Sequence, residues 1–250
     1  MRKFTAFMFW ARELFELLKF IVLIPFSWFW QAPQVKKSFS NRAQIVLVPG
    51  FLGRGLEFLP LKRKLEKAGF EVFIAQLGFQ ASQIQTKGQR LAEFLEAEQI
   101  ENATLLGYSL GGWISLQLPE KARWRVKTLI TLGVAFRGTP MAILLSPLKA
   151  ARQLIPGSSF LKQAHSPWLH FPNHFNFYAQ RDEITASQRT SQLKGIQEHV
   201  LPVQGHLNLI CHPLAQKELV AQLIQTETAL NRGGNCSELK SSRDKILARS

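Results

Sequence analysis

The chain has 250 residues, of which 46% are hydrophobic and 11% aromatic, and 31 Lys and Arg against 17 Asp and Glu give it a formal net charge of +14. This composition fits one large domain with a buried core and excludes a disordered chain, and two cysteines exclude a disulfide framework. More than half of the excess positive charge lies in residues 1–42 and 231–250, which argues against a basic nucleic-acid-binding domain.

Residues 1–40 form a strongly apolar, aromatic segment with few charges. Arg12, Glu13, Glu16 and Lys19 fall in one narrow sector of a helical wheel, so the pattern predicts a helix with a single polar stripe. The segment has neither an unbroken apolar stretch nor a small-residue cleavage site, so we expect no cleavable signal peptide. The charge-free run after Lys19 is too short to span a bilayer, which favours a helix lying in the membrane surface.

Two other interpretations of this segment stay open. The whole segment could form a tilted spanning anchor, or it could be a helix buried in an oligomer or capping the core. Three basic residues follow the apolar part of this segment, where they would meet anionic headgroups: Lys36, Lys37 and Arg42. We therefore expect a membrane-associated protein with anionic lipids as its partner, placed on the cytoplasmic face.

Between residues 41 and 230, short apolar runs alternate with helical patterns, which is typical of a mainly parallel sheet covered by helices on both faces. The expected strands are Gln44–Val48, Glu71–Leu77, Thr104–Leu106, Val126–Leu132, Phe175–Ala179 and Val200–Val203. The expected helices are Leu61–Ala68, Gly88–Glu98, Leu110–Leu118 and Pro213–Leu230. Residues 139–174 contain five prolines and no strand pattern, so we expect a cap inserted into the domain. For residues 231–250 the composition predicts a mobile basic tail.

A G-x-S-x-G motif runs from Gly107 to Gly111, with Ser109 at its centre. It stands between a predicted strand and a predicted helix, where glycines let the two approach around a sharp turn that leaves the serine exposed. In this context the motif resembles the nucleophile elbow of the α/β-hydrolases. Within them it is similar to the lipase and esterase branch, which includes lipases with an HGxxG-type oxyanion loop and GPI-inositol-deacylase-like proteins. The resemblance covers about residues 43–225.

In these hydrolases the catalytic residues follow in the order serine, acid, histidine. The resemblance implies Ser109 as nucleophile and Asp182, which comes shortly after a predicted strand, as the acid. Asp244, the other aspartate of the chain, lies in the predicted tail, and Glu183 is the alternative acid. His206, after a strand that ends in Gly205, matches the final histidine loop of the family, with His212 as the alternative base.

The oxyanion of the reaction would need two backbone N–H donors. The resemblance implies Leu110, directly after the serine, and Phe51 in the loop after the first core strand. Pro49 stands where many such lipases have histidine, so hydrogen-bond support for this loop must come from elsewhere.

These residues predict a serine hydrolase that cleaves carboxylic esters, of lipids or acyl groups at a membrane interface, through an acyl-serine intermediate. No cofactor, metal or nucleic acid is expected. A thioesterase or acyltransferase would use the same three residues, and a soluble small-molecule esterase or a non-catalytic membrane-bound scaffold with this fold are further alternatives. The sequence leaves the acyl-chain length and the oligomeric state open.

Overall fold

The computed structural model describes residues 2–27, 42–78, 80–164, 171, 173–193 and 195–231. Residues 232–250 of the predicted basic tail lie outside these residues, as do Lys36, Lys37 and the segment 165–170 of the predicted cap; Asn231 is the last residue of a helix.

The core is a six-stranded sheet in the order β2-β1-β3-β4-β5-β6, and all its neighbouring strands are parallel. Side chains of β1 and β3 are buried on both faces, as a sheet covered by helices on both sides requires. Because the strands are parallel, their carboxyl ends meet at one edge. The strand bounds are β1 Gln44–Val48, β2 Glu71–Ile74, β3 Ala103–Tyr108, β4 Val126–Leu132, β5 His174–Arg181 and β6 Gln197–Gln204.

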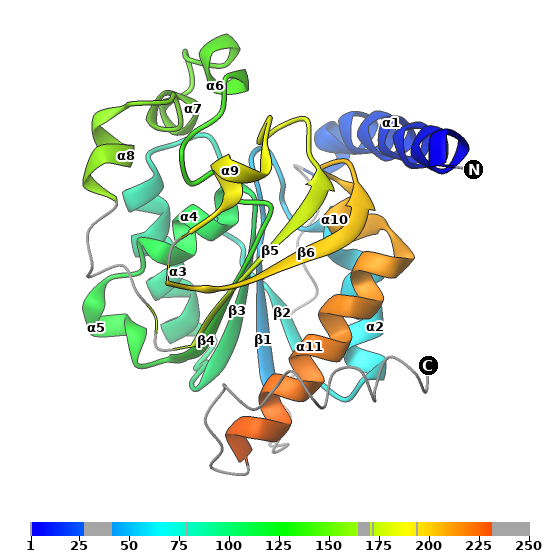
Figure 1. Ribbon diagram of the computed structural model, residues 1–250. Coiled ribbons are helices and arrows are strands. Elements are labelled where there is room, and N and C mark those ends of the chain that lie inside the picture. The colour runs from blue at the N-terminus through cyan, green and yellow to red at the C-terminus, as the bar shows by residue number, and fades with distance from the viewer. Residues whose placement is uncertain are drawn as a thin grey trace.

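Helices cover both faces of the sheet, which confirms the predicted layers (Figure 1). On one face lie α3 (Ile84–Ala97) and α4 (Leu110–Leu116), and on the other lie α2 (Leu59–Lys67) and α11 (Pro213–Asn231). Each layer has its own buried apolar cluster against the sheet. Four short elements connect the larger ones: η1 Leu56–Phe58, α5 Glu120–Arg123, α9 Gln188–Ser191 and α10 Asn208–Cys211.

The predicted cap begins with three short helices, α6 (Met141–Leu144), α7 (Lys149–Gln153) and α8 (Ser159–Gln163). Helices α7 and α8 bury side chains in the core cluster shared with α3 and α4, whereas α6 leaves Ile143 and Leu144 exposed. The cap is therefore anchored to the core through α7 and α8, and it carries exposed apolar side chains at α6.

Helix α1 (Arg2–Ser27) packs against β6, α10 and η1 at the carboxyl edge of the sheet (Figure 1). The two acids of its polar stripe face the protein, and Glu13 and Glu16 are each 5% exposed. The basic side chains Arg12 and Lys19 lie at the border with solvent. Its apolar side faces outward, with Leu14 58% and Phe15 62% exposed. Phe9, an apolar residue inside the polar sector, also points inward and packs its ring 4.8 Å from that of His212.

No helix among the described residues is both long enough and apolar enough to cross a membrane.

Candidate active site

Ser109 lies between β3 and α4 on a strained backbone with φ 53° and ψ −121°. A non-glycine residue adopts such a conformation only where the surrounding structure enforces it. Here the Ser109 N–H donates to Leu132 O at 2.8 Å, and Ser109 O accepts from the Gly112 N–H at 3.1 Å. The sharp turn presents a half-buried serine at the carboxyl edge of the sheet.

Both glycines that flank the elbow are required by close backbone approach. A β-carbon on Gly111 would lie 2.1 Å from Val48 O, and one on Gly107 would lie 2.6 Å from the α-carbon of Gly112. Neither neighbour is a flexible side chain, so the strand and the helix can meet this closely only without side chains at these two positions.

Gly111→Ala is therefore expected to lower the free energy of unfolding by about 3 kcal/mol, because the added methyl overlaps a backbone carbonyl that cannot move alone. Urea unfolding monitored by circular dichroism measures this loss. Gly69→Ala is the control, since a β-carbon there meets no atom within 4 Å although φ is +96°. Alanine at this strained but unobstructed position is expected to lower the free energy of unfolding by about 1 kcal/mol. Equal losses in both variants would contradict a steric role for Gly111.

Asp182 and His206 meet at the same edge of the sheet. Asp182 directly follows β5 and His206 follows β6 by two residues. The Nδ1 atom of His206 lies 2.7 Å from Oδ2 of Asp182, and both side chains are buried. Oδ1 of Asp182 accepts the backbone N–H groups of Ile184 at 2.9 Å and Thr185 at 3.0 Å, which holds the carboxylate in place.

The imidazole of His206 is enclosed by residues that flank Ser109. The ring of Tyr108, the residue before Ser109, lies 5.0 Å from the imidazole, and its hydroxyl donates to His206 O at 3.1 Å. A β-carbon on Gly133, next to the Leu132 carbonyl that binds Ser109, would lie 3.2 Å from Cε1 of His206. Residues far apart in sequence thus lie together beside Ser109, namely Tyr108, Gly133 and His206.

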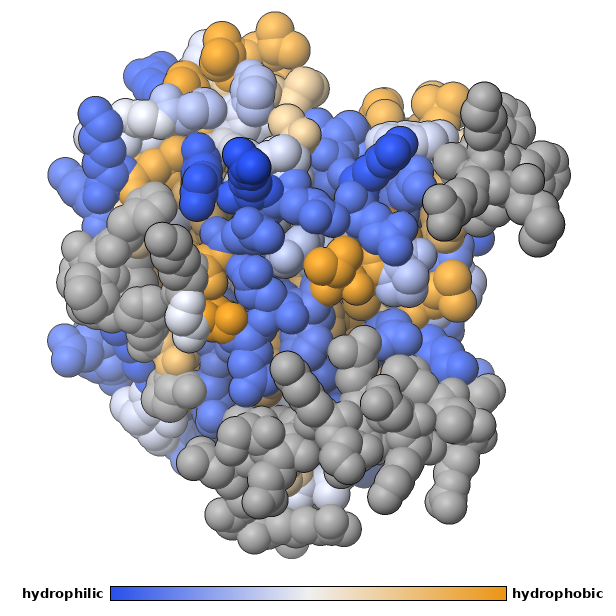
Figure 2. All heavy atoms as spheres, in the orientation of Figure 1, coloured by the Kyte–Doolittle hydropathy of each residue, from blue (hydrophilic) through white to orange (hydrophobic). Residues whose placement is uncertain are grey.

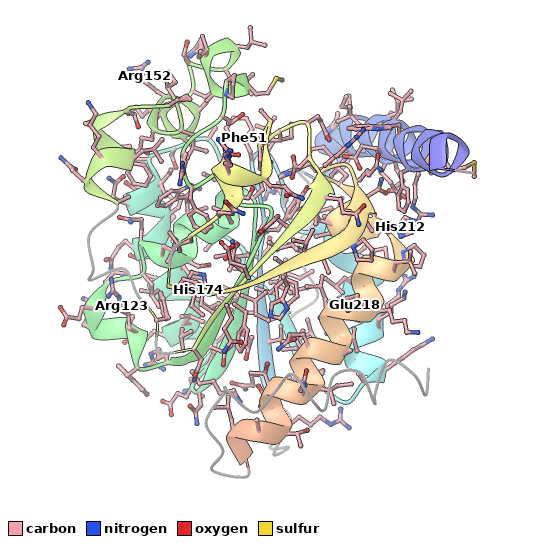
Figure 3. All side chains as sticks on the ribbon, viewed as in Figure 1. Phe51, Arg123, Arg152, His174, His212 and Glu218 are labelled. Carbon is pink, nitrogen blue, oxygen red and sulfur yellow. The ribbon has the colours of Figure 1, made fainter. Side chains whose placement is uncertain are left out.

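The structure separates these residues from their sequence alternatives. Glu183 accepts the backbone N–H of His206, at 3.3 and 3.2 Å, rather than its imidazole. His212 lies at the start of α11 (Figure 3), where its Nδ1 accepts the N–H of Leu214 at 3.2 Å. His174, which the sequence assigned to the cap, is the first residue of β5 and contacts Thr131 Oγ1 at 2.9 Å.

The acid and the base shift each other's pKa in opposite directions. Burial alone would lower the pKa of His206, but the adjacent Asp182 carboxylate, its hydrogen bond and the nearby Glu183 and Glu13 raise it above its ordinary value. Burial alone would raise the pKa of Asp182, but His206 and the N–H donors of Thr185 and Ile184 lower it. The pair therefore favours an ionised Asp182 beside an imidazole that accepts a proton readily.

The two predicted oxyanion donors belong to segments next to Ser109. Leu110 is the buried first residue of α4, and Phe51 lies in the turn after β1 at the carboxyl edge (Figure 3). The turn approaches the serine closely, since a β-carbon on Gly50 would lie 3.1 Å from that of Ser109. Support for this turn comes from Gln80, whose buried side-chain amide donates to Pro49 O at 3.3 Å.

Sequence reasoning missed Tyr108, Gln80 and Glu13, which support the predicted site residues. Tyr108 occupies a variable position of the motif, and nothing in the sequence distinguishes Gln80 from other glutamines. Glu13 did carry a signal, because it is one of few acids in an apolar helix. Its carboxylate accepts the backbone N–H groups of Leu207 and Asn208, directly after His206.

Several solved structures resemble this fold. A Bacillus licheniformis lipase, BlEst2 in its mature form, superposes with a TM-score of 0.57 at 20% identity, covering 70% of this chain and 89% of that chain. Aspergillus fumigatus lipase B gives a TM-score of 0.61 at 19% identity over 76% of this chain and 55% of its own. A Paleococcus ferrophilus monoacylglycerol lipase gives 0.53 at 16% identity over 72% and 93%. These likenesses show the fold.

No curated protein matches the chain significantly. The family model described as "alpha/beta hydrolase fold" matches residues 44–180, which is more than half of the chain and includes β1 to β4, all but the last residue of β5, and Ser109. The chain belongs to the α/β-hydrolase family.

Proposed function

We propose that the protein is a serine hydrolase that cleaves carboxylic esters of acyl lipids at a membrane surface. The observation that carries the proposal is the 2.7 Å contact of His206 with Asp182 beside Ser109, which stands on a strained turn at the same edge of the sheet. Nucleophile, base and acid in this arrangement form the constellation used for acyl transfer.

In the proposed reaction the ionised Asp182 accepts a hydrogen bond from the protonated Nδ1 of His206, which leaves the unprotonated Nε2 as the base. Nε2 takes the proton of Ser109 while Oγ bonds to the ester carbonyl carbon. The N–H groups of Phe51 and Leu110 stabilise the oxyanion, and its collapse breaks the ester bond as His206 protonates the leaving alcohol. His206 then takes a proton from water as its oxygen bonds to the carbonyl carbon of the acyl-serine, and returns that proton to Oγ of Ser109 as the bond to Oγ breaks and the acid is released. No step needs a cofactor.

The pKa of His206 predicts an acid limb in the activity profile. Only the neutral imidazole can take a proton from Ser109, and the pKa of His206 is raised above its ordinary value of 6.5. We therefore expect kcat/KM to be constant at high pH and to fall as the pH drops through that raised value, with a midpoint above 6.5. A kcat/KM profile for a short-chain p-nitrophenyl ester measures the midpoint. A midpoint well below 6.5 would contradict His206 as the base.

An apolar crevice beside the site supports an acyl substrate. It opens between α1 and the loop that follows Phe51. Its lining is mainly apolar and includes Phe20, Leu52, Leu56 and Leu207, together with the charged residues Glu16, Lys19, Arg54 and Glu57. Leu52 and Leu207 are the sequence neighbours of Phe51 and His206. We propose that this crevice receives part of the acyl chain of the substrate.

Exposed apolar side chains support the membrane interface. They gather on the outer side of α1 and at the tip of α6, both at the edge of the sheet that carries the site (Figure 2). Leu18 is 55% exposed and Leu144 75%. Such apolar surfaces are poorly solvated by water, and the acyl region of a membrane would cover the exposed side chains of α1 and α6. The net positive charge of the chain favours anionic headgroups, such as those of the cytoplasmic leaflet.

Activity on vesicles and flotation with vesicles test the substrate class and the membrane interface. We expect long-chain acyl esters presented in vesicles of phosphatidylcholine and phosphatidylglycerol to be cleaved, and the wild-type protein to float with these vesicles. A Leu14→Glu, Leu18→Glu double variant should lose flotation and vesicle activity but keep activity on a soluble short-chain ester. Trp124→Glu is the control, since Trp124 is 60% exposed but lies next to α5 at the opposite edge. Unchanged flotation of the double variant would contradict the interface.

A further inference from the structure

Glu13 of α1 reaches the turn that carries His206. Its Oε1 accepts the N–H of Leu207 at 2.6 Å, and its Oε2 accepts the N–H of Asn208 at 2.8 Å. The carboxyl group is almost completely buried. A side chain near the start of the sequence thus binds the two consecutive backbone groups that follow His206.

The fit between α1 and this turn is close. The Asn208 side-chain amide donates to Phe9 O of α1 at 3.0 Å and to Gln204 O at 2.8 Å. Gly205 has φ +100°, and a β-carbon there would lie 2.3 Å from Oε2 of Glu13. Only glycine leaves room for the carboxyl group at this position.

Glu13 completes the hydrogen bonding of the turn. The backbone N–H of His206 donates to Glu183, and its carbonyl accepts from Tyr108. Leu207 directly precedes α10 and Asn208 begins it, and the first N–H groups of a helix have no partner within it. Glu13 supplies the acceptors for these N–H groups, so its loss would leave two buried donors unpaired and free the turn to shift.

The pKa of Glu13 reflects its burial against the turn. Burial raises this pKa to about 8; the N–H donors of Leu207 and Asn208 oppose the rise, and the facing Glu183 reinforces it. The two N–H donors thus offset part of the cost of burying the carboxyl group. Glutamine keeps the shape of the side chain and one acceptor oxygen.

We propose that Glu13 is a positioning residue, through which α1 fixes the turn after His206 and keeps the imidazole directed at Ser109. The role rests on the proposed esterase function of Ser109 and His206. Displacing a catalytic group by about 1 Å costs up to about 100-fold in rate, although no contact with the substrate is lost. Helix α1 lies outside the segment 44–180 that matches the family model, so this support comes from outside the matched region.

Steady-state kinetics on a soluble short-chain ester test the role without a membrane. Glu13→Ala is expected to lower kcat by about 10- to 100-fold and to change KM by less than about 3-fold. Glu13→Gln keeps one acceptor oxygen and should recover most of kcat. Arg12→Ala is the matched control, because Arg12 also ties α1 to the body, by donating to Cys211 O at 3.1 Å, but does not bind the turn. Its kcat should stay within about 3-fold of wild type.

The outcomes separate this proposal from the proposed function. A folded wild-type protein that neither hydrolyses esters nor reacts with a fluorophosphonate would overturn both. An active wild type with the same kcat in Glu13→Ala and Arg12→Ala would overturn the positioning role alone. Unfolding of both Glu13 variants, seen by circular dichroism, would assign Glu13 to stability and also overturn it.

Discussion

Ser109→Ala is expected to lower kcat/KM for ester hydrolysis by at least about 10⁴-fold, because it removes the only atom that forms the acyl-enzyme. The β-carbon is retained at the strained position, so the fold should persist with an unchanged unfolding midpoint. Initial rates on a short-chain p-nitrophenyl ester, measured over a wide range of enzyme concentration, quantify the loss.

A second serine on the same helix controls for the Ser109 substitution. Ser115 is buried in α4, and its hydroxyl donates to Gly111 O at 2.8 Å. Ser115→Ala removes a hydroxyl of the same kind without touching the proposed chemistry, so its kcat/KM should stay within about 3-fold of wild type. A Ser109→Ala protein that retains a tenth of the wild-type rate would exclude Ser109 as nucleophile.

Asp182→Asn is expected to lower kcat by about 10⁴-fold. The Oδ1 atom of Asp182 accepts two backbone N–H groups, and the asparagine oxygen would keep these bonds. Its NH₂ group would then face Nδ1 of His206 and require a lone pair there, which moves the imidazole proton to Nε2. A protonated Nε2 cannot accept the proton of Ser109, so kcat measured at the plateau of the pH profile should fall.

Glu183→Gln distinguishes the two neighbouring acids. Glu183 accepts the backbone N–H of His206, and glutamine can still accept this bond through its carbonyl oxygen. We expect a loss of less than about 10-fold, accompanied by a lower pKa of His206 because a nearby negative charge is removed. A larger loss in Glu183→Gln than in Asp182→Asn would identify Glu183 as the acid.

The sheet could be predicted from sequence because it is buried on both faces. Strands β1 and β4 are rich in apolar and β-branched residues, and the structure confirms the predicted bounds of both. Strand β5 continues beyond the predicted Ala179 to Arg181, because Arg181 pairs with Gln204 of β6 although both residues are polar. Strand β2 stops at Ile74, short of the predicted Leu77, where the chain leaves the sheet edge.

The elements that hold the candidate site were harder to predict, because they depend on contacts between distant segments. A helical wheel groups Glu13 with Glu16, but it does not say whether that face meets water or protein. The structure turns this face toward the protein, where Glu13 binds amides nearly two hundred residues away. The contact of Gln80 with the loop after β1 likewise follows from the packing of two loops rather than from any local pattern.

The position of α1 also decides which experiments can test the membrane interface. Deleting α1 would remove the exposed apolar surface and Glu13 together, so a loss of activity would not separate them. Charged substitutions at Leu14 and Leu18 change only the outward face, since both side chains are more than half exposed. Point variants on opposite faces of one helix therefore separate membrane attachment from the support of His206.

The most direct test of the account is mass spectrometry of the folded protein after reaction with a fluorophosphonate, which traps an activated serine as a stable adduct. The proposed mechanism predicts one phosphonate per chain, located on the peptide that contains Ser109, absent in Ser109→Ala and formed far more slowly in Asp182→Asn. A folded wild-type protein that acquires no adduct, or acquires the same adduct in Ser109→Ala, would contradict the account.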